Sequence, residues 1–343
     1  MGTVPRAVTV KLVQFAQPHH DVVDAAFEAA FPDVRFVKTA DSGACAAELG
    51  DAEILLITSQ FYDAGIADAL ARAAGRVEWI QFATTGFDAA SRIGLPDDAR
   101  ITNVRGIRSS ILAGHAIALM LGVMRGLHAF APHRARHDWA RGAVQHELIS
   151  PGGATAVICG MGGVGRDIAR KARVFDMKVI GVSRKGAAGG DFDAVVPREE
   201  VRSVLPEADV LFLAQGYSPE VRHFIGEAEL ALMKREAILV NIGRGELTDE
   251  AALARALAEK RIKGAGIDVY SEEPLGPASP FWDLDNVVMT PHVAGRGMAD
   301  EKARLRALFS ENLGRYLARR TLLNRVTAEG EAILDAEADA AGA

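Results

Sequence analysis

Short apolar runs alternate with alanine-rich amphipathic stretches along the first third of the chain. The runs typical of buried strands lie at residues 7–15, 34–37, 53–58 and 78–82. The stretches between them that favour helices lie at residues 21–30, 42–49 and 64–74. Strands that alternate with helices predict a parallel sheet with helices on both faces.

A second series with the same alternation begins after Pro151-Gly152-Gly153. Its strands are expected at residues 154–159, 178–182, 209–214, 237–242, 264–269 and 286–290. A long apolar helix over about residues 109–128 joins the two series. A further helix over about residues 298–319 is expected to pack back on the first series.

This pattern predicts an α/β protein with two doubly wound parallel-sheet domains and a cleft between them. We expect residues 1–103 and 294–326 to form a discontinuous substrate-binding domain. Residues 104–293 are expected to form a Rossmann dinucleotide-binding domain. Residues 327–343 are rich in Ala, Glu and Asp and are expected to be a flexible tail.

The composition of the 343 residues, 49% hydrophobic and 24% charged, suits two ordinary globular domains. The net charge of −6 argues against a nucleic acid or an anionic membrane as partner. The N-terminus lacks the pattern of a signal peptide, and the apolar stretch 111–123 is short and interrupted, so we expect a cytoplasmic protein without membrane spans. Cys45 and Cys159 are far apart in sequence, which favours packed thiols over a disulfide or a metal site.

A glycine-rich turn follows the strand expected at residues 154–159 and precedes a helix. Its G-x-G-x-x-G spacing lets Gly160 turn sharply, Gly162 approach a pyrophosphate, and Gly165 pack the helix against the strand. Backbone amides at the start of such a helix point at the anion. The predicted dinucleotide contacts are Gly160, Gly162, Gly163, Val164 and Gly165.

Charged side chains follow each of the last three expected strands. Arg244 lies between two glycines after the first of these strands, Glu272 and Glu273 follow the second, and His292 follows the third. Parallel sheets hold ligands at the carboxyl ends of their strands. An arginine can clamp a carboxylate, a protonated histidine can give a proton to a carbonyl oxygen, and a glutamate can keep that histidine protonated. With a nicotinamide as hydride donor, this set predicts reduction of a 2-keto acid.

Four stretches together resemble the motifs of the D-isomer-specific 2-hydroxyacid dehydrogenase family, which contains glyoxylate/hydroxypyruvate reductases. The stretches are residues 160–165, 233–245, 264–274 and 286–295. The resemblance extends over about residues 50–320, and it implies a Rossmann nucleotide domain, a flavodoxin-like substrate domain and a homodimer. By position in these motifs, the implied catalytic residues are Arg244, Glu273 and His292, with Glu273 preferred over Glu272 because it directly precedes Pro274.

The resemblance also implies contacts with the substrate and the cofactor. Thr85 and Gly86, in the loop at residues 83–88, are implied to offer backbone N–H groups to the substrate carboxylate that Arg244 clamps. Asp268 is assigned to the cofactor site. No metal is expected.

Cofactor choice depends on the end of the strand expected at residues 178–182. An NAD site has Asp or Glu there to bind the ribose 2′-hydroxyl, whereas this chain has Ser183 followed by Arg184 and Lys185. A hydroxyl and two positive charges suit a 2′-phosphate, so NADP(H) is the expected cofactor. The alternative is that Arg184 and Lys185 form a solvated basic turn and that NAD(H) binds.

Three other side chains have simpler interpretations. The family often has a glutamate before the histidine at position 115, but Gly114 occupies that position here, so His115 is interpreted as a packing or interface residue. Trp139 and Trp282 are interpreted as core or interface aromatics, although a partner's tryptophan lines the substrate pocket in some glyoxylate reductases, so Trp139 is a candidate for that contact.

The expected function is NAD(P)H-dependent reduction of a small 2-keto acid, of the glyoxylate or hydroxypyruvate kind, to the D-2-hydroxy acid. One alternative is an NAD-linked dehydrogenase of a larger D-2-hydroxy acid. The other is a non-catalytic dinucleotide-sensing protein on the same fold. The presence of Arg244, Glu273 and His292 favours an enzyme.

Overall fold

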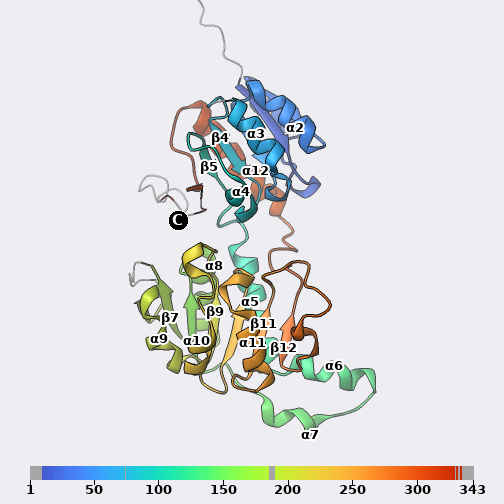
Figure 1. Cartoon of the computed structure of the whole chain (residues 1–343), viewed down its shortest axis with the longest axis vertical. Helices are drawn as coiled ribbons and strands as arrows, with labels where there is room; N and C mark the ends of the chain where they lie inside the picture. Colours follow the sequence, from blue (N-terminus) through green and yellow to red (C-terminus); the bar gives the residue numbers. More distant parts are fainter. Residues whose placement is uncertain (1–9, 74, 185–189, 329, 331–332, 334–343) are drawn as a thin grey trace, which may run out of the picture. The chain divides into compact units, whose positions relative to one another are not determined.

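The computed structural model of the chain describes residues 10–73, 75–184, 190–328, 330 and 333. Lys185 and most of the expected tail therefore lie outside the described residues. Contacts between Cα atoms divide the chain into two compact units. Unit 1 is Met1–Ile107 with Ala299–Ala343, and unit 2 is Arg108–Met298. Both units combine strands with helices (Figure 1).

Unit 1 has, among its described residues, a six-stranded sheet in the order β13-β5-β4-β3-β1-β2. The strands are β1 Val10–Phe15, β2 Val34–Lys38, β3 Ile54–Ile57, β4 Trp79–Phe82, β5 Arg100–Thr102 and β13 Arg325–Val326. The first five are parallel in the flavodoxin-like order 2-1-3-4-5, and β13 pairs antiparallel with β5. The expected α/β class with a flavodoxin-like unit is confirmed.

Helices of unit 1 follow from clear capping and apolar signals. They are α1 Ala25–Ala30, α2 Ser42–Glu48, α3 Ala64–Ala73, α4 Asp88–Ile93 and α12 Glu301–Leu317. Asp24 and Asp41 cap α1 and α2 by accepting hydrogen bonds from backbone amides of the first turn. The apolar face of α12, which includes Leu305, Phe309 and Leu313, packs in the same core cluster as the first sheet. In Figure 1 the orange-red α12 accordingly lies among the blue and teal elements of unit 1.

Unit 2 has, in its described part, a seven-stranded parallel sheet in the order β12-β11-β10-β9-β6-β7-β8. The strands are β6 Thr155–Cys159, β7 Lys178–Ser183, β8 Ala194–Pro197, β9 Val210–Leu213, β10 Ile238–Asn241, β11 Gly264–Ile267 and β12 Val287–Met289. The strand order reverses between β6 and β9, and doubly wound sheets bind ligands at the carboxyl edge of such a switch point. This arrangement confirms the Rossmann expectation.

The helices of unit 2 are α5 Ser109–Met124, α6 Leu127–Ala135, α7 Arg141–Val144, α8 Gly163–Val174, α9 Val201–Val204, α10 Glu227–Leu232 and α11 Glu250–Ala258. Helices cover both faces of the second sheet, with α5 and α8 on one face and α10 and α11 on the other. Ala156 and Ile158 belong to one core cluster with α5 and α8, whereas Val157 and Cys159 belong to another with α10 and α11. Since successive residues of a strand point to opposite faces, β6 is buried on both sides. Cys159 is one of its fully buried residues, as Cys45 is in unit 1, and burial raises the pKa of both thiols.

The expected long helix over residues 109–128 is too long. It ends at Met124, because Gly126 has a left-handed backbone with φ of 59°, and α6 begins at the next residue. Three short strands were not predicted, namely β5, β8 and β13. They have two to four residues each, which is too short for a recognisable apolar period.

Trp139 and Trp282 are not core residues, since they are 91% and 55% exposed. Over the described residues, no single helix is long and apolar enough to cross a membrane. The bent pair α5 and α6 reaches that length and hydropathy together, but its segments make an angle of 64°. Much of α5 is buried in the core of unit 2.

Candidate active site

The turn between β6 and α8 requires glycine, because the backbone packs closely there. Gly160 has φ of 103°, and a Cβ there would lie 2.8 Å from the backbone nitrogen of Gln215. A Cβ on Gly165 would lie 1.8 Å from the carbonyl oxygen of Gly160. No side chain fits at either position, which is the tight turn and close helix–strand contact that the motif predicts.

The middle of the turn is open in the way that a phosphate requires. Gly162 lies directly before α8, and a Cβ there would have no atom within 4 Å in the described structure. Gly162 therefore leaves room for a ligand at the positive end of a twelve-residue helix. Gly163 is constrained instead, because its Cβ would lie 2.6 Å from Ser109 Oγ. The turn thus fits the pyrophosphate of a dinucleotide.

The end of β7 lies beside this turn, because β7 is the neighbour of β6 in the sheet. Ser183 is the last residue of β7 and is partly buried, and Arg184 follows it and is exposed. Their position agrees with the one where dinucleotide sites contact the adenosine ribose. Lys185 lies outside the described residues.

Arg244 follows β10 in a turn that admits only glycine on either side. A Cβ on Gly243 would lie 2.6 Å from the carbonyl oxygen of Gln215, and one on Gly245 would lie 1.9 Å from the carbonyl carbon of Tyr270. Asn241 braces the turn, since its side-chain amide donates to the Arg244 carbonyl at 2.9 Å and accepts from the Gly243 amide at 3.1 Å. The guanidinium donates to the Gly243 carbonyl at 2.7 Å, and the side chain is half-buried.

Glu273 and His292 form a direct pair. Glu273 Oε2 lies 2.7 Å from His292 Nδ1, and the exposed fractions of the two side chains are 35% and 50%. The backbone amide of Tyr270 donates to the other carboxylate oxygen of Glu273 at 3.0 Å, which orients the carboxylate. Because Nδ1 is engaged by Glu273, Nε2 is the imidazole nitrogen left to face a substrate.

Tyr270 itself is a rigid part of this turn. Burial raises its pKa, and the nearby charges of Asp268, Glu250 and Glu273 raise it further. The phenol therefore stays protonated at neutral pH and donates toward the carbonyl oxygens of Ile267 and Thr290, at 3.3 and 3.4 Å. These contacts tie the turn after β11 to the end of β12.

Asp268, assigned by resemblance to the cofactor site, is 1% exposed and binds the segment around His292. One carboxylate oxygen accepts from Thr290 Oγ1 at 2.6 Å and from the Val293 amide at 2.9 Å, and the other accepts from the Ala294 amide at 3.0 Å. The Asp268 carbonyl accepts from the His292 amide at 2.8 Å. Sequence reasoning missed this structural role, because the contacts join the ends of two strands that pair only in the fold.

The three predicted catalytic residues follow three neighbouring strands. Arg244 follows β10, Glu273 follows β11 and His292 follows β12, and these strands are adjacent in the parallel sheet. Parallel strands end at one edge, and the glycine turn follows β6 at that same edge. The arrangement can therefore present an anion clamp and a proton donor beside a dinucleotide.

Thr85 and Gly86 belong to unit 1 and follow β4 at the carboxyl edge of its sheet. Asn103 Nδ2 donates to the Thr85 carbonyl at 2.8 Å, which holds the loop. Considering only the described residues, the structure shows no hydrogen bond donated by the Thr85 or the Gly86 amide.

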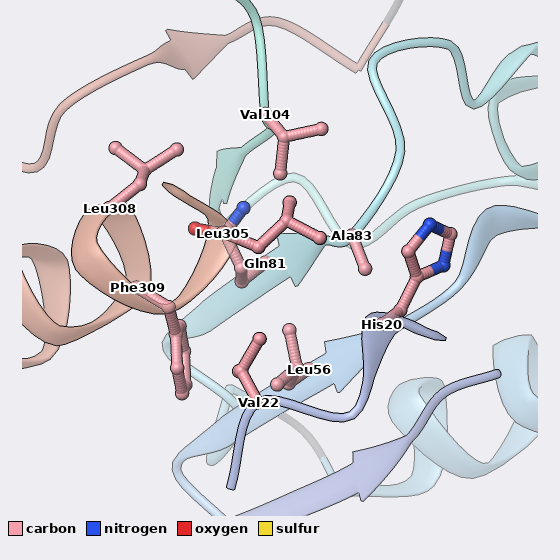
Figure 2. Close-up of a pocket in the computed structure, with 9 residues that line it drawn as sticks. All are labelled: His20, Val22, Leu56, Gln81, Ala83, Val104, Leu305, Leu308 and Phe309. Atoms are coloured by element: carbon pink, nitrogen blue, oxygen red, sulfur yellow. The ribbon is translucent and has the colours of Figure 1, made fainter. Parts of the chain in front are cut away.

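A cavity in unit 1 is too small for a keto acid. Its walls come mainly from α12 and the strands of the first sheet, with His20 and Gln81 as polar members, as Figure 2 shows. Its volume is about 10 Å³, about the minimum for one water molecule. A larger hollow of about 240 Å³ in unit 2 is lined by Met124, Asp209 and Glu236. The last two residues precede β9 and β10, so this hollow lies at the amino edge, opposite to the catalytic candidates.

Comparisons with known proteins identify the family of this chain. The sequence profile of the family described as D-isomer specific 2-hydroxyacid dehydrogenase, NAD binding domain, matches residues 117–294. A glyoxylate reductase of Aeropyrum pernix is 34% identical over 251 residues, which cover 70% of this chain and 73% of that protein. A glyoxylate reductase of Pyrococcus furiosus is 35% identical, and the match covers 62% of this chain and 64% of that protein, slightly under two thirds of its length.

Solved structures match over almost the whole chain. A D-isomer specific 2-hydroxyacid dehydrogenase family protein of Aeromonas salmonicida has a TM-score of 0.80 and 26% identity, with 93% of this chain and 99% of that chain covered. An NADPH-dependent glyoxylate/hydroxypyruvate reductase of Sinorhizobium meliloti, solved with NADP and sulfate, has a TM-score of 0.76 and 25% identity, with 94% and 99% covered. The chain therefore belongs to the D-isomer specific 2-hydroxyacid dehydrogenase family, and it is an oxidoreductase with a domain that binds a nicotinamide dinucleotide.

Proposed function

We propose that this enzyme uses NADPH to reduce a small 2-keto acid, of the glyoxylate or hydroxypyruvate class, to the D-2-hydroxy acid. The observation that carries the proposal is the 2.7 Å contact between Glu273 Oε2 and His292 Nδ1, at the strand ends that adjoin Arg244. A guanidinium, a carboxylate and an imidazole at three neighbouring strand ends supply the groups that the reduction of a keto acid needs.

In this mechanism the Arg244 guanidinium binds the substrate carboxylate and polarises the neighbouring carbonyl. The Glu273 carboxylate favours the imidazolium form of His292, and His292 gives its Nε2 proton to the carbonyl oxygen. Reduced nicotinamide, when bound, supplies the hydride that the carbonyl carbon accepts. After the reaction His292 is neutral, and it takes up a proton from solvent through its half-exposed ring.

The preference for NADPH rests on Ser183 and Arg184 at the end of β7. A carboxylate at that position would repel a 2′-phosphate, whereas a hydroxyl and a guanidinium can bind it. The reductase of Sinorhizobium meliloti is described as NADPH-dependent, and a probable 2-hydroxyacid dehydrogenase of Rhizobium etli was solved with NADP. Both relatives support the proposal.

A panel of 2-keto acids with NADPH and with NADH, followed by nicotinamide absorbance, tests the function. We expect turnover with two- and three-carbon keto acids and a higher kcat/KM with NADPH. Turnover only of larger acids with NADH would favour the NAD-linked dehydrogenase. Binding of NADPH without turnover of any acid would favour a dinucleotide sensor.

We also propose that the chain works as a homodimer through the segment that contains α6 and α7. All nine residues of α6 are described, and none is buried within the chain, although Leu127 and Phe130 are large and apolar. Trp139, in the same segment, is 91% exposed. Exposed apolar surface of this kind marks protein contacts. Light scattering on the wild type and on Trp139→Ala tests the proposal, because a monomeric wild type would refute it.

A further inference from the structure

His115 lies in the second turn of α5 and contacts the end of β12. Its Nε2 is 2.9 Å from Thr290 Oγ1 and 3.6 Å from Asp268 Oδ1. The imidazole side chain is 22% exposed, and the Asp268 side chain is 1% exposed. The ring is therefore directed into a buried polar cluster, which the interpretation of His115 as a packing or interface residue does not explain.

The chemistry of a hydroxyl group fixes the direction of these hydrogen bonds. Thr290 Oγ1 donates its single proton to Asp268 Oδ1 at 2.6 Å. The same oxygen can then only accept from His115, so Nε2 must carry a proton and donate it. The result is a directed chain from His115 through Thr290 to the Asp268 carboxylate.

This series of hydrogen bonds ends at the Asp268 carboxylate, which holds the segment around His292. Both carboxylate oxygens of Asp268 accept backbone amides, from Val293 and from Ala294, and the Asp268 carbonyl accepts from the His292 amide. His292 has φ of 52°, a left-handed conformation that costs energy for a residue with a side chain. Such a conformation persists only where the surrounding contacts impose it.

We propose that His115 is a positioning residue, which acts through Thr290 and Asp268 to hold the backbone of residues 290–294 and so to aim the imidazole of His292. The inference deepens the proposed function, since it rests on His292 as the proton donor. The hydrogen bond from His115 Nε2 orients the Thr290 hydroxyl, and this hydroxyl in turn holds the Asp268 carboxylate in place.

Removal of the imidazole should leave the fold intact, because apolar contacts hold α5 in place. Ala113, Ala116 and Leu119 on this helix are buried. A Cβ on Gly266 would lie 2.7 Å from Leu119 Cβ, so the helix packs directly against β11. The position of α5 therefore does not depend on His115.

The test compares variants that remove the His115 donor or the Thr290 hydroxyl with variants that keep these groups. His115→Ala loses the donor, whereas His115→Gln keeps an N–H group on a side chain of similar reach. Thr290→Val loses the hydroxyl at constant shape, whereas Thr290→Ser keeps it. Ser110→Ala is the control on the same helix, because it removes only an exposed hydrogen bond from Lys171.

Hydrogen–deuterium exchange by mass spectrometry, over a peptide that contains residues 290–294, gives a readout that needs no turnover. We expect exchange about tenfold faster in His115→Ala and Thr290→Val, with rates near wild type in the other three variants. In the keto-acid assay, kcat should fall about tenfold in the two disruptive variants while the Kd for NADPH stays unchanged. The rescue by Gln and Ser separates a hydrogen-bonding role from mere packing.

Exchange in His115→Ala equal to wild type, or equally fast exchange in His115→Ala and His115→Gln, would overturn the inference. If His115→Ala does not fold, Thr290→Val against Thr290→Ser makes the same comparison. A wild type that binds NADPH but reduces no keto acid would refute the proposed function alone, and the exchange pattern would still support or overturn the assignment of His115.

Discussion

His292 Nδ1 lies 2.7 Å from Glu273 Oε2, although the two residues are nineteen positions apart in sequence. The contact joins the turn after β11 to the end of β12, two strands that are neighbours in the parallel sheet. It leaves Nε2 as the nitrogen that can act on a substrate, and it places a negative charge where it favours the imidazolium.

Replacement of His292 by Ala should lower kcat for keto-acid reduction by roughly 10²–10⁴-fold, because the proton donor is lost. The Kd for NADPH should stay near wild type. His223→Ala is a matched control, since His223 is exposed and has the same φ of 52°. Equal kcat in His292→Ala and His223→Ala would remove His292 from the mechanism.

The variant Glu273→Gln keeps the size of the side chain but loses its charge. The carboxylate accepts a hydrogen bond from His292 Nδ1 and orients the imidazole, so its loss should lower kcat/KM for the keto acid by about 10- to 100-fold at a fixed pH. Steady-state kinetics measure this loss. Glu272→Gln, at the exposed neighbouring position, should keep the wild-type kcat/KM. An equal loss in both variants would assign Glu273 no special role.

The variant Arg244→Lys tests the carboxylate clamp, and we expect it to lower kcat/KM for the keto acid by about 10- to 100-fold. Lysine keeps the positive charge but loses the planar fork that binds a carboxylate through two hydrogen bonds. Arg235→Lys, at an exposed position before β10, is the control for charge and expression. Wild-type kcat/KM in Arg244→Lys would rule out the carboxylate clamp.

Coenzyme preference should depend on Arg184. A charge-assisted hydrogen bond to phosphate contributes about 1.5–3 kcal/mol, so Arg184→Ala should weaken NADPH binding by roughly 10- to 150-fold and NADH binding much less. The double variant Ser183→Asp with Arg184→Ala should prefer NADH over NADPH. In the wild type, higher salt should reduce the ratio of kcat/KM with NADPH to kcat/KM with NADH. The measurement is kcat/KM for both coenzymes at two salt concentrations. A wild type that already prefers NADH would contradict the assignment.

Two glycines of the same turn should respond differently to alanine. Gly165→Ala should lower Tm, because its Cβ would lie 1.8 Å from the Gly160 carbonyl oxygen. Gly162→Ala should keep Tm, because the space around its Cβ is open, but it should weaken dinucleotide binding by intruding on the phosphate. Calorimetric unfolding and titration with NADPH separate the two effects. Equal loss of Tm in both variants would contradict this division of roles.

Much of the local structure was predictable from the chain alone. The buried runs that became β3, β6 and β9 are apolar on both faces, which is the pattern of strands covered by helices on either side. Gly160 and Gly165 were identified because a G-x-G-x-x-G turn needs residues without a Cβ. Arg244, Glu273 and His292 stood out because each lies in the segment after an apolar strand and in a stretch that resembles a motif of the family.

Contacts between segments far apart in sequence were not predictable in the same way. The pairing of β13 with β5 depends on a two-residue strand that carries no periodic signal. His115 gave no sign of its bond to Thr290, because a histidine in an apolar helix looks the same whether it packs or donates.

The amino-acid sequence was enough to predict the alternation of strands and helices and the glycine turn, because these follow from the period of apolar side chains and from local backbone sterics. The fold was needed to show that Asp268 holds the segment of His292 and that His115 contacts the same cluster. Those contacts arise from the order in which strands pair and from the face on which α5 packs, and many long-range contacts acting together set both.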